Sequence, residues 1–436
     1  MRRQIAAILT GLATTAFVAA TLAIAPQAAA EPGTVVRFGP GASANRYVGG
    51  AFDACTAPPL STMIAWGASP YRAIGVYVGG PNRTCAQPNL TPAWVGSVTR
   101  RQWQLLPIYM GLQAPCSDRV QAIKIVRATA AAQGTSSATD AIASMTAIGL
   151  RPGSIVYGDM ENYNATDSAC RAAVLTYLSA FTKELHRRGY LVGIYANLGS
   201  GAQHLTGAYE STSSARPDAL WVARWDGSPT LTGLAGIPDS LWAAHQRAKQ
   251  YLGDHDETYG GVTVNIDSNW VDAPVATVIQ PYLLVGRTNA RTAPSRTSTA
   301  AGVLANGTSL SVICQTPGTT VNGTKVWNKL SNGTYVNDHY VNTPSDTDFT
   351  APIPRCYYPF QVIAKDGLSK RSGPGGTFTK QGTLGSGSLA WTYCQAAGSK
   401  VATTKVWDRI DTGSYVSDFY LTTASKTTYS SPLPRC

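Results

Sequence analysis

Two carboxylates that could act together in acid–base chemistry lie two residues apart in the stretch SIVYGDMENY, residues 154–163. Asp159 and Glu161 follow an apolar run, and alternate residues of a β-strand point to the same face, with Cβ atoms about 6–7 Å apart. Cleavage of a glycosidic bond needs a proton donor for the leaving oxygen. It also needs a second carboxylate that acts as nucleophile, activates water or stabilises positive charge. The expected spacing lies between those of retaining and inverting enzymes, so both stereochemical outcomes stay open.

Two further acids, Asp53 and Asp267, lie in the first and last apolar runs of the same part of the chain. Carboxylates crowded into one site raise the pKa of at least one of them, which keeps an acid protonated near neutral pH. Aromatic rings beside them could stack on sugars, and amides could bind sugar hydroxyls. The side chains that we expect to contact a substrate are Tyr109, Tyr157, Tyr195, Asn197, Trp225, Gln250 and Trp270.

Each acid also has a simpler interpretation as a salt bridge or a cap; Asp267, for example, could pair with Arg224. Four acids at matching strand ends favour a site over four separate structural charges. Clustered carboxylates would also suit Mg²⁺ or Ca²⁺, but we predict a site without metal or cofactor. His245, His255 and Asp256 match no catalytic or metal-binding spacing.

The elements that would position these residues are eight short apolar runs that alternate with helix-like stretches. Such a series over residues 31–278 predicts an α/β fold, a (β/α)8 barrel of the TIM type, whose active sites lie at the C-terminal ends of the strands. The Thr91-Pro92 pair predicts a helix start, and Gly189 predicts a helix end. The expected strands are 47–54, 73–80, 104–111, 154–161, 190–197, 219–226, 246–251 and 262–269.

Side-chain alternation gives these strands one aliphatic face, for the helix layer, and one face that becomes acidic and aromatic towards its end. In the fourth run, Tyr157, Asp159 and Glu161 share a face opposite Val156 and Met160. The four acids should therefore meet at one mouth of the barrel.

Eight cysteines follow residue 30, an even number that indicates disulfides and an oxidising compartment. Cys55, Cys85, Cys116 and Cys170 each follow one of the first four strands, so they would lie on one rim. Their order predicts the pairs Cys55–Cys85 and Cys116–Cys170. No CxxC or paired Cys/His spacing indicates zinc.

A repeat with an offset of 80 residues occupies the C-terminal part of the chain, where KVWNKLSNGTYV returns as KVWDRIDTGSYV. Each copy has two cysteines 42 residues apart, which predicts the pairs Cys314–Cys356 and Cys394–Cys436. The first copy has Asn-Gly pairs at 306, 322 and 332, a strong signal for β-hairpins. Each copy is therefore expected to be a small all-β barrel, residues 279–356 and 357–436.

The stretches KRSGPGGTFTKQGTLGSGSLAWTYCQ and KVW…GSYVSDFYL of the second copy resemble bacterial SH3-like domains. That resemblance implies binding to cell-wall peptide or glycan and a role in targeting. The alternative is a spacer that adds only stability.

The stretches GGAFDACTAPPLSTMIAW, LLPIYMGLQAPC, IVYGDMENY, RAKQYLGD and YGGVTVNIDSNWVD resemble an actinobacterial glycoside-hydrolase-like domain of unknown function. That family is similar to family 25 lysozymes, which cut the glycan of peptidoglycan. The resemblance implies that Glu161 is the general acid and that Asp159, Asp267 and Asp53 orient substrate or stabilise charge. The FDAC ending of the first strand and the cysteines on the rim depart from those lysozymes.

The first thirty residues have two arginines, a long apolar stretch and an Ala-Ala-Ala ending, which predicts a secretory signal cleaved before Glu31. The net charge of +11 falls to +9 without Arg2 and Arg3, and it forms no basic run. That pattern argues against nucleic acid and suits work beside an anionic bacterial envelope. We expect a secreted monomer that binds cell-wall glycan or peptidoglycan and has no stable membrane insertion after cleavage.

Two functions compete on this sequence. The first is a wall hydrolase with muramidase-like acid catalysis, and the second is a non-catalytic protein that uses the barrel to dock on glycan. A protease or esterase is disfavoured because no GxSxG motif occurs.

Overall fold

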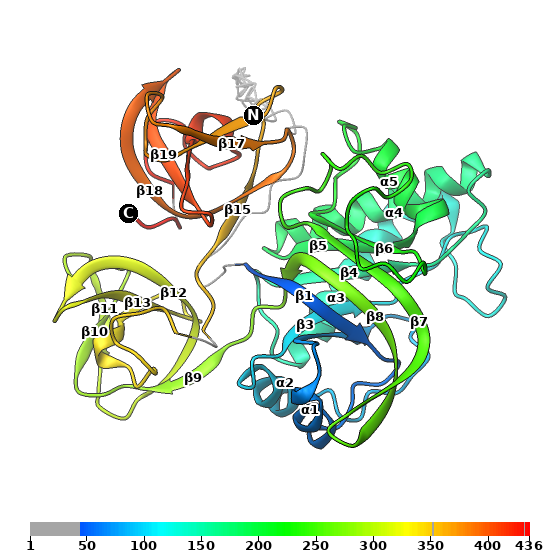
Figure 1. Cartoon of the computed structure of the whole chain (residues 1–436), viewed down its shortest axis with the longest axis horizontal. Coiled ribbons are helices and arrows are strands. Elements are labelled where there is room, and N and C mark those ends of the chain that lie inside the picture. The colour runs from blue at the N-terminus through cyan, green and yellow to red at the C-terminus, as the bar shows by residue number, and fades with distance from the viewer. Residues whose placement is uncertain (1–43, 351–352, 431) are drawn as a thin grey trace, which may run out of the picture. The chain divides into compact units, whose positions relative to one another are not determined.

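The computed structural model describes residues 44–350, 353–430 and 432–436, so the predicted signal of residues 1–30 lies outside the described residues. Eight strands form a closed barrel in a mixed α/β arrangement (Figure 1). All eight predicted strands are present; the ends of the first six differ by at most about three residues, whereas the seventh and eighth continue to Tyr259 and Val275, beyond the predicted ends at 251 and 269. They are β1 Asn45–Asp53, β2 Ala73–Gly79, β3 Gln104–Tyr109, β4 Ile155–Met160, β5 Leu191–Asn197, β6 Ala219–Ala223, β7 Arg247–Tyr259 and β8 Val262–Val275.

The last strand corrects the predicted (β/α)8 topology. Strands β1 to β7 are parallel to their neighbours, whereas β8 pairs antiparallel with both β7 and β1. Only Gly260 and Gly261 connect β7 to β8, and both have a positive φ, as a tight hairpin turn requires. A parallel pair would need a crossover of a dozen or more residues. The barrel therefore closes through a hairpin.

Helices follow each of the first five strands. They are α1 Leu60–Ala65, α2 Pro92–Thr99, α3 Ala130–Ala147, α4 Ser168–Arg187 and α5 Gln203–Gly207, and between β6 and β7 the described residues contain no helix. Thr91 caps α2 by accepting a hydrogen bond from the Trp94 N–H, which confirms the predicted start. Gly189, with φ 80°, follows the end of α4, as predicted. In the described part of the chain, no helix is both long and apolar enough to cross a membrane.

Two apolar layers hold the barrel together. The outer layer packs strand residues such as Phe52, Val156 and Ile194 against the helices. The inner layer fills the barrel, where the Tyr157 ring meets Trp221 edge to face and the Tyr157 hydroxyl donates to the Pro274 carbonyl. Because the interior is packed, a ligand can reach the barrel only at its end.

Two six-stranded, curled antiparallel sheets follow the barrel, and both have the same strand order. The first contains β9 Gln280–Leu283, β10 Thr288–Arg291, β11 Ala300–Leu304, β12 Ser309–Val321, β13 Thr324–Leu330 and β14 Tyr335–Asn337. The second contains β15 Tyr358–Gln361, β16 Leu368–Arg371, β17 Lys380–Leu384, β18 Leu389–Val401, β19 Thr404–Ile410 and β20 Tyr415–Ser417. The 80-residue repeat is therefore a structural repeat, and the Asn-Gly pairs lie between strands, as predicted.

All four predicted disulfides are confirmed. Two tie loops at the rim of the barrel, and one closes each C-terminal repeat. The pairs are Cys55–Cys85, Cys116–Cys170, Cys314–Cys356 and Cys394–Cys436.

The turn between β18 and β19 offers a test of turn chemistry. Ala402 has φ 48°, where the equivalent residue of the first repeat is Asn322, with φ 45°. Asparagine tolerates this left-handed conformation better than alanine, which loses about 1 kcal/mol there. Ala402→Asn should therefore raise the free energy of unfolding by about 0.5–1 kcal/mol in urea titrations followed by fluorescence. Asn322→Ala should lower it by a similar amount, and a change of the same sign in both variants would contradict this account.

Candidate functional site

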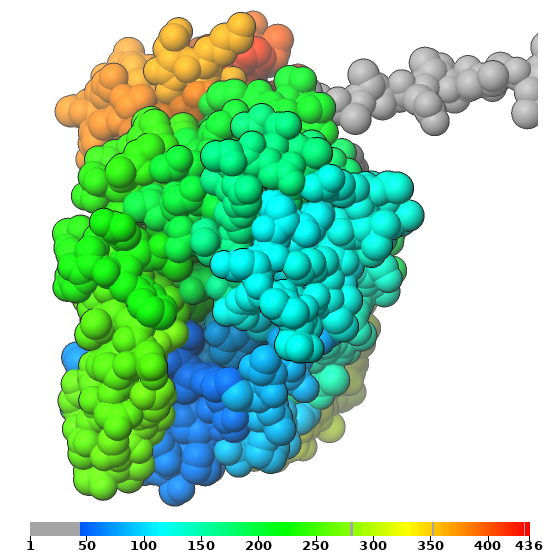
Figure 2. All heavy atoms as spheres, turned by 90° about the vertical axis from the view of Figure 1, so that its right-hand side faces the viewer, coloured from blue at the N-terminus to red at the C-terminus, as the bar shows by residue number. Residues whose placement is uncertain are grey.

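A pocket of about 370 Å³ opens at the end of the barrel where the parallel strands finish. Figure 2 shows a face of the molecule that is hollowed between the blue, cyan and green segments. All four predicted carboxylates line this pocket: Asp53 from the end of β1, Asp159 from β4, Glu161 just beyond β4, and Asp267 from β8. They form two pairs with different surroundings.

The first pair, Asp53 and Asp267, lies directly across the antiparallel ladder of β1 and β8. The Gln250 Nε2 atom donates to Asp53 at 3.2 Å and to Asp267 at 3.0 Å, and the Asn269 amide donates to Asp53 at 2.8 Å. Burial, followed by repulsion from Asp267, raises the pKa of Asp53 to about 7. Burial also raises the pKa of Asp267, although the Asp254 N–H donates to it at 2.6 Å.

The second pair, Asp159 and Glu161, is fixed through the backbone by the buried side chain of Gln113. Its amide donates to the Asp159 carbonyl at 2.9 Å and its oxygen accepts from the Glu161 N–H at 2.9 Å. The Asp159 carboxyl is 5% exposed, and its Oδ1 atom has no hydrogen-bond partner among the described residues. Burial, together with repulsion from Glu161, raises the pKa of Asp159 well above its usual range.

Glu161 differs from Asp159 because it has a cationic partner. Arg119 Nη2 lies 2.9 Å from Glu161 Oε1, and the Arg119 side chain is 48% exposed. Burial raises the pKa of Glu161, the Arg119 charge opposes that rise, and the net shift is upwards. Arg119 lies in the loop tied by Cys116–Cys170.

Two aromatic side chains meet the same amide that links the first pair. The Tyr195 hydroxyl and the Trp225 indole donate to Gln250 Oε1 at 2.9 and 2.8 Å. The Trp225 ring covers the backbone of Gly253, where a Cβ atom would lie 2.3 Å from the ring. Trp225 is nevertheless 60% exposed, so its ring is accessible to a ligand.

A second hollow, of about 620 Å³, adjoins the first. It is lined by Asn197 and Arg224, and it shares Glu161, Tyr195 and Trp225 with the first hollow. Glu161 therefore lies between two cavities, an arrangement that suits a chain-like ligand extending in both directions.

The structure contradicts three of the predicted substrate contacts. Tyr109 points outward because its neighbour Ile108 faces the interior of the barrel. The Tyr109 hydroxyl donates to Asp140 of α3, and its ring stacks on Phe181. Tyr157 faces inward but is completely buried beneath the site. Trp270 follows the inward-facing Asn269, so strand alternation places it on the outside of β8, 38% exposed. Tyr195, Asn197, Trp225 and Gln250 do lie in the two hollows.

Other residues of the site were not predicted from the sequence. Tyr77 lines the pocket and is found at an alternating position of β2, so the pattern contained a usable signal for it. Asn269 shares the face of Asp267 and could have been found in the same way. Gln113 and Arg119 lie in the loop after β3, where no periodicity identifies them.

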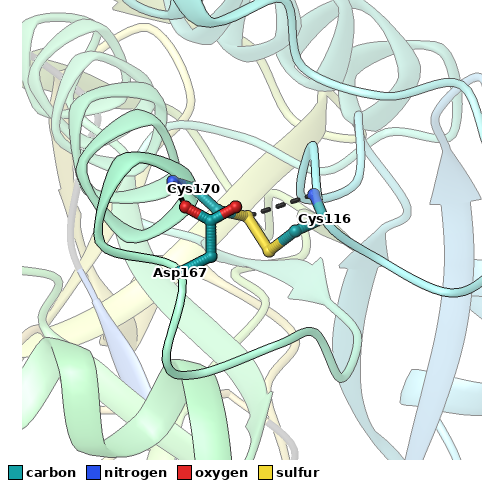
Figure 3. Close-up of side chains that lie close together, drawn as sticks. All are labelled: Cys116, Asp167 and Cys170. Atoms are coloured by element: carbon teal, nitrogen blue, oxygen red, sulfur yellow. Dashed lines mark hydrogen bonds between the residues drawn. A yellow bond between two sulfur atoms is a disulfide. The ribbon is translucent and has the colours of Figure 1, made fainter.

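A group with the appearance of a metal site lies near the rim (Figure 3). Cys116, Asp167 and Cys170 bring ligand-type atoms within 4.8 Å of one another. The two sulfur atoms form a disulfide and so provide no thiolate. Asp167 caps α4 by accepting from the Cys170 N–H at 2.9 Å and pairs with Arg127. These interactions account for the group without a metal.

Comparison with known proteins agrees with a glycoside-hydrolase-like domain. Residues 64–271 match the family model described as Rv2525c-like, glycoside hydrolase-like domain. The matched range includes Asp159, Glu161 and Asp267 but begins after Asp53. No curated protein sequence matches the chain.

The solved structures to which the chain is similar include the Tat-secreted protein Rv2525c of Mycobacterium tuberculosis, 16% identical over 52% of this chain and 96% of that one, with a TM-score of 0.38. The spore cortex lytic enzyme SleM of Clostridium perfringens is 12% identical over 61% and 88%, with a TM-score of 0.33. The autolysin LytC of Streptococcus pneumoniae is 10% identical over 51% and 46%, with a TM-score of 0.34.

The raised pKa of Asp53 predicts how stability depends on pH. Between the ordinary value of 3.8 and about 7, the folded protein holds a proton that the unfolded chain has released. The free energy of unfolding should therefore fall as the pH rises through this window. The substitution Asp53→Asn removes the group that must ionise but keeps an oxygen that can accept from Gln250 and Asn269. It should therefore stabilise the protein by on the order of 2 kcal/mol at pH 8 and have little effect at pH 4.

Urea titrations at both pH values would measure this difference. Asp118→Asn, at an exposed carboxylate near the rim that does not line the pocket, is the matched control. An equal fall in stability from pH 4 to pH 8 in the parent and in Asp53→Asn would contradict the prediction.

Proposed function

We propose that this chain is a glycoside hydrolase that cleaves peptidoglycan or a related cell-envelope polysaccharide by muramidase-like acid catalysis. The observation that carries the proposal is the position of Glu161 between two adjoining hollows, beside the buried carboxylates Asp53 and Asp159 and the half-buried Asp267. A linear glycan lying across both hollows would bring a glycosidic oxygen to Glu161. The match of residues 64–271 to a glycoside-hydrolase-like family supports this proposal.

In this mechanism Glu161 donates the proton to the leaving oxygen. Burial favours its protonated form, and loss of the Arg119 contact on substrate binding would favour that form further. The remaining carboxylates, Asp159, Asp53 and Asp267, orient the substrate, and one that has released its proton stabilises the positive charge that develops on the sugar. Water then adds to the anomeric carbon and completes the hydrolysis. Trp225 supplies an exposed ring for sugar stacking, and Asn197 supplies an amide for its hydroxyls. Gln250 holds Asp53 and Asp267 in place.

The C-terminal repeats would serve as SH3-like targeting modules, residues 279–356 and 357–436, behind a barrel domain of residues 31–278. Their shared strand order and single internal disulfide support this division. Four disulfides favour an oxidising compartment, in agreement with a secreted protein whose residues 1–30 are a signal. We further propose that the protein acts as a monomer, without metal or cofactor.

One observation favours a second function, a glycan-binding protein without catalysis. An ion pair with Arg119 stabilises the charged form of Glu161, and a charged carboxylate cannot donate a proton. If Arg119 stays in place when glycan binds, the acidic pocket would dock the polymer and leave it intact.

Incubation with purified peptidoglycan separates these two functions. The parent protein should release new reducing ends, and Glu161→Gln should lower their rate of release by about 100-fold or more, because it removes the acid but keeps the size of the side chain. Glu210→Gln, at an exposed glutamate of the same barrel that does not line either hollow, should keep the parental rate.

Two outcomes would contradict the hydrolase. Equal rates for the parent and Glu161→Gln would remove Glu161 from catalysis. No reducing ends from any variant, while all of them sediment with the peptidoglycan, would support the docking function.

A further inference from the structure

The first C-terminal sheet has a pocket of about 410 Å³ whose charged residues are all arginines. It lies beside β10 and the turn between β12 and β13, in the part of the molecule coloured yellow in Figure 1. Its arginine and asparagine lining residues are Arg287, Arg291, Arg296, Asn289, Asn322 and Asn337.

The three guanidinium groups are not neutralised by the protein. Among the described residues, no carboxylate forms an ion pair with any of them. The nearby acids interact elsewhere: Asp338 accepts from Gln315 and Asn328, and Asp346 pairs with His339. Three like charges around one hollow repel one another, and they attract an anion into it.

The second repeat has the same backbone at this position but not the same charge. The Arg296 N–H donates to Thr319 Oγ1 at 2.8 Å, and the equivalent Gly376 N–H donates to Ser399 Oγ at 2.8 Å. The second repeat has glycine in place of Arg287 and Arg296, and it keeps only Arg371 of the three arginines. The fold therefore does not need the charges of Arg287 and Arg296, which are both exposed. Arg291 and its equivalent Arg371 each donate to a backbone carbonyl of their own repeat, that of Ser298 and that of Phe378.

We propose that the pocket of the first repeat binds the phosphodiester groups of an anionic polyol or sugar polymer. Guanidinium forks match phosphate oxygens with two parallel hydrogen bonds. The amides of Asn289 and Asn322 can bind the hydroxyl groups between phosphates, whereas the Asn337 amide is buried and bonds the backbone of Val326 and His339. A polymer with one charge per unit presents several anions to three arginines, whereas the carboxyl terminus of a peptide presents only one.

The test measures binding of the full chain to a soluble glycerol phosphate oligomer by calorimetry. Arg287→Gln combined with Arg296→Gly should weaken binding by at least about tenfold, because it removes two charge-assisted contacts. Glycine at the second position is compatible with the fold, as Gly376 demonstrates. The control pair is Lys325→Ala with Lys405→Ala, which removes two exposed cations outside the pocket and should change the affinity by about twofold or less.

Polyglutamate and a neutral glycan oligomer serve as competing probes. Failure to bind glycerol phosphate, equal weakening by the control pair, or tighter arginine-dependent binding of polyglutamate would each overturn the proposal. Glu161→Gln should bind the phosphate oligomer like the parent, so the result is independent of whether the barrel is a hydrolase.

Discussion

The constraint on which the site depends is the crowding of four carboxylates, two buried and two half-buried, at one end of a packed barrel. Charged acids so close together are unstable out of water, and the pKa of each is raised for this reason. Side-chain amides make this arrangement feasible: Gln250 joins Asp53 and Asp267, and Gln113 fixes the backbone of the other two. The Gln250 amide satisfies carboxylate oxygens without adding charge.

The same crowding of carboxylates lowers the stability of the folded protein, and contacts in the surrounding structure offset this loss. The closing hairpin of β7 and β8 matters most, because antiparallel pairing sets Asp267 directly opposite Asp53. Two disulfides then tie the loops that carry rim residues, among them Arg119. The site is thus held by covalent links and a continuous ladder, while the Arg119 side chain stays half exposed.

The sequence predicted the strands, the disulfides and the meeting of the four acids because each depends on local alternation or order along the chain. The prediction failed where contacts with other elements of the folded chain determine how a residue or strand is placed. Tyr109 occupies an alternate position near the end of its strand, as the site residues of other strands do. Which face of β3 turns inward, however, depends on how the strand tilts in the closed barrel. The reversal of β8 was missed because an apolar run has no direction, although the Gly260-Gly261 pair was a readable turn signal. Gln113 and Arg119 lie in a loop, where only the folded chain determines what they touch.

All four disulfides join consecutive cysteines of the chain: Cys55 with Cys85, Cys116 with Cys170, and likewise in each repeat. Eight cysteines can pair in about a hundred ways. In any chain of this cysteine order that enters an oxidising environment unfolded and N-terminus first, the first free partner that each odd-numbered cysteine meets is its native one. Oxidation in order of emergence therefore gives the native set directly, and slow exchange among wrong pairs is avoided.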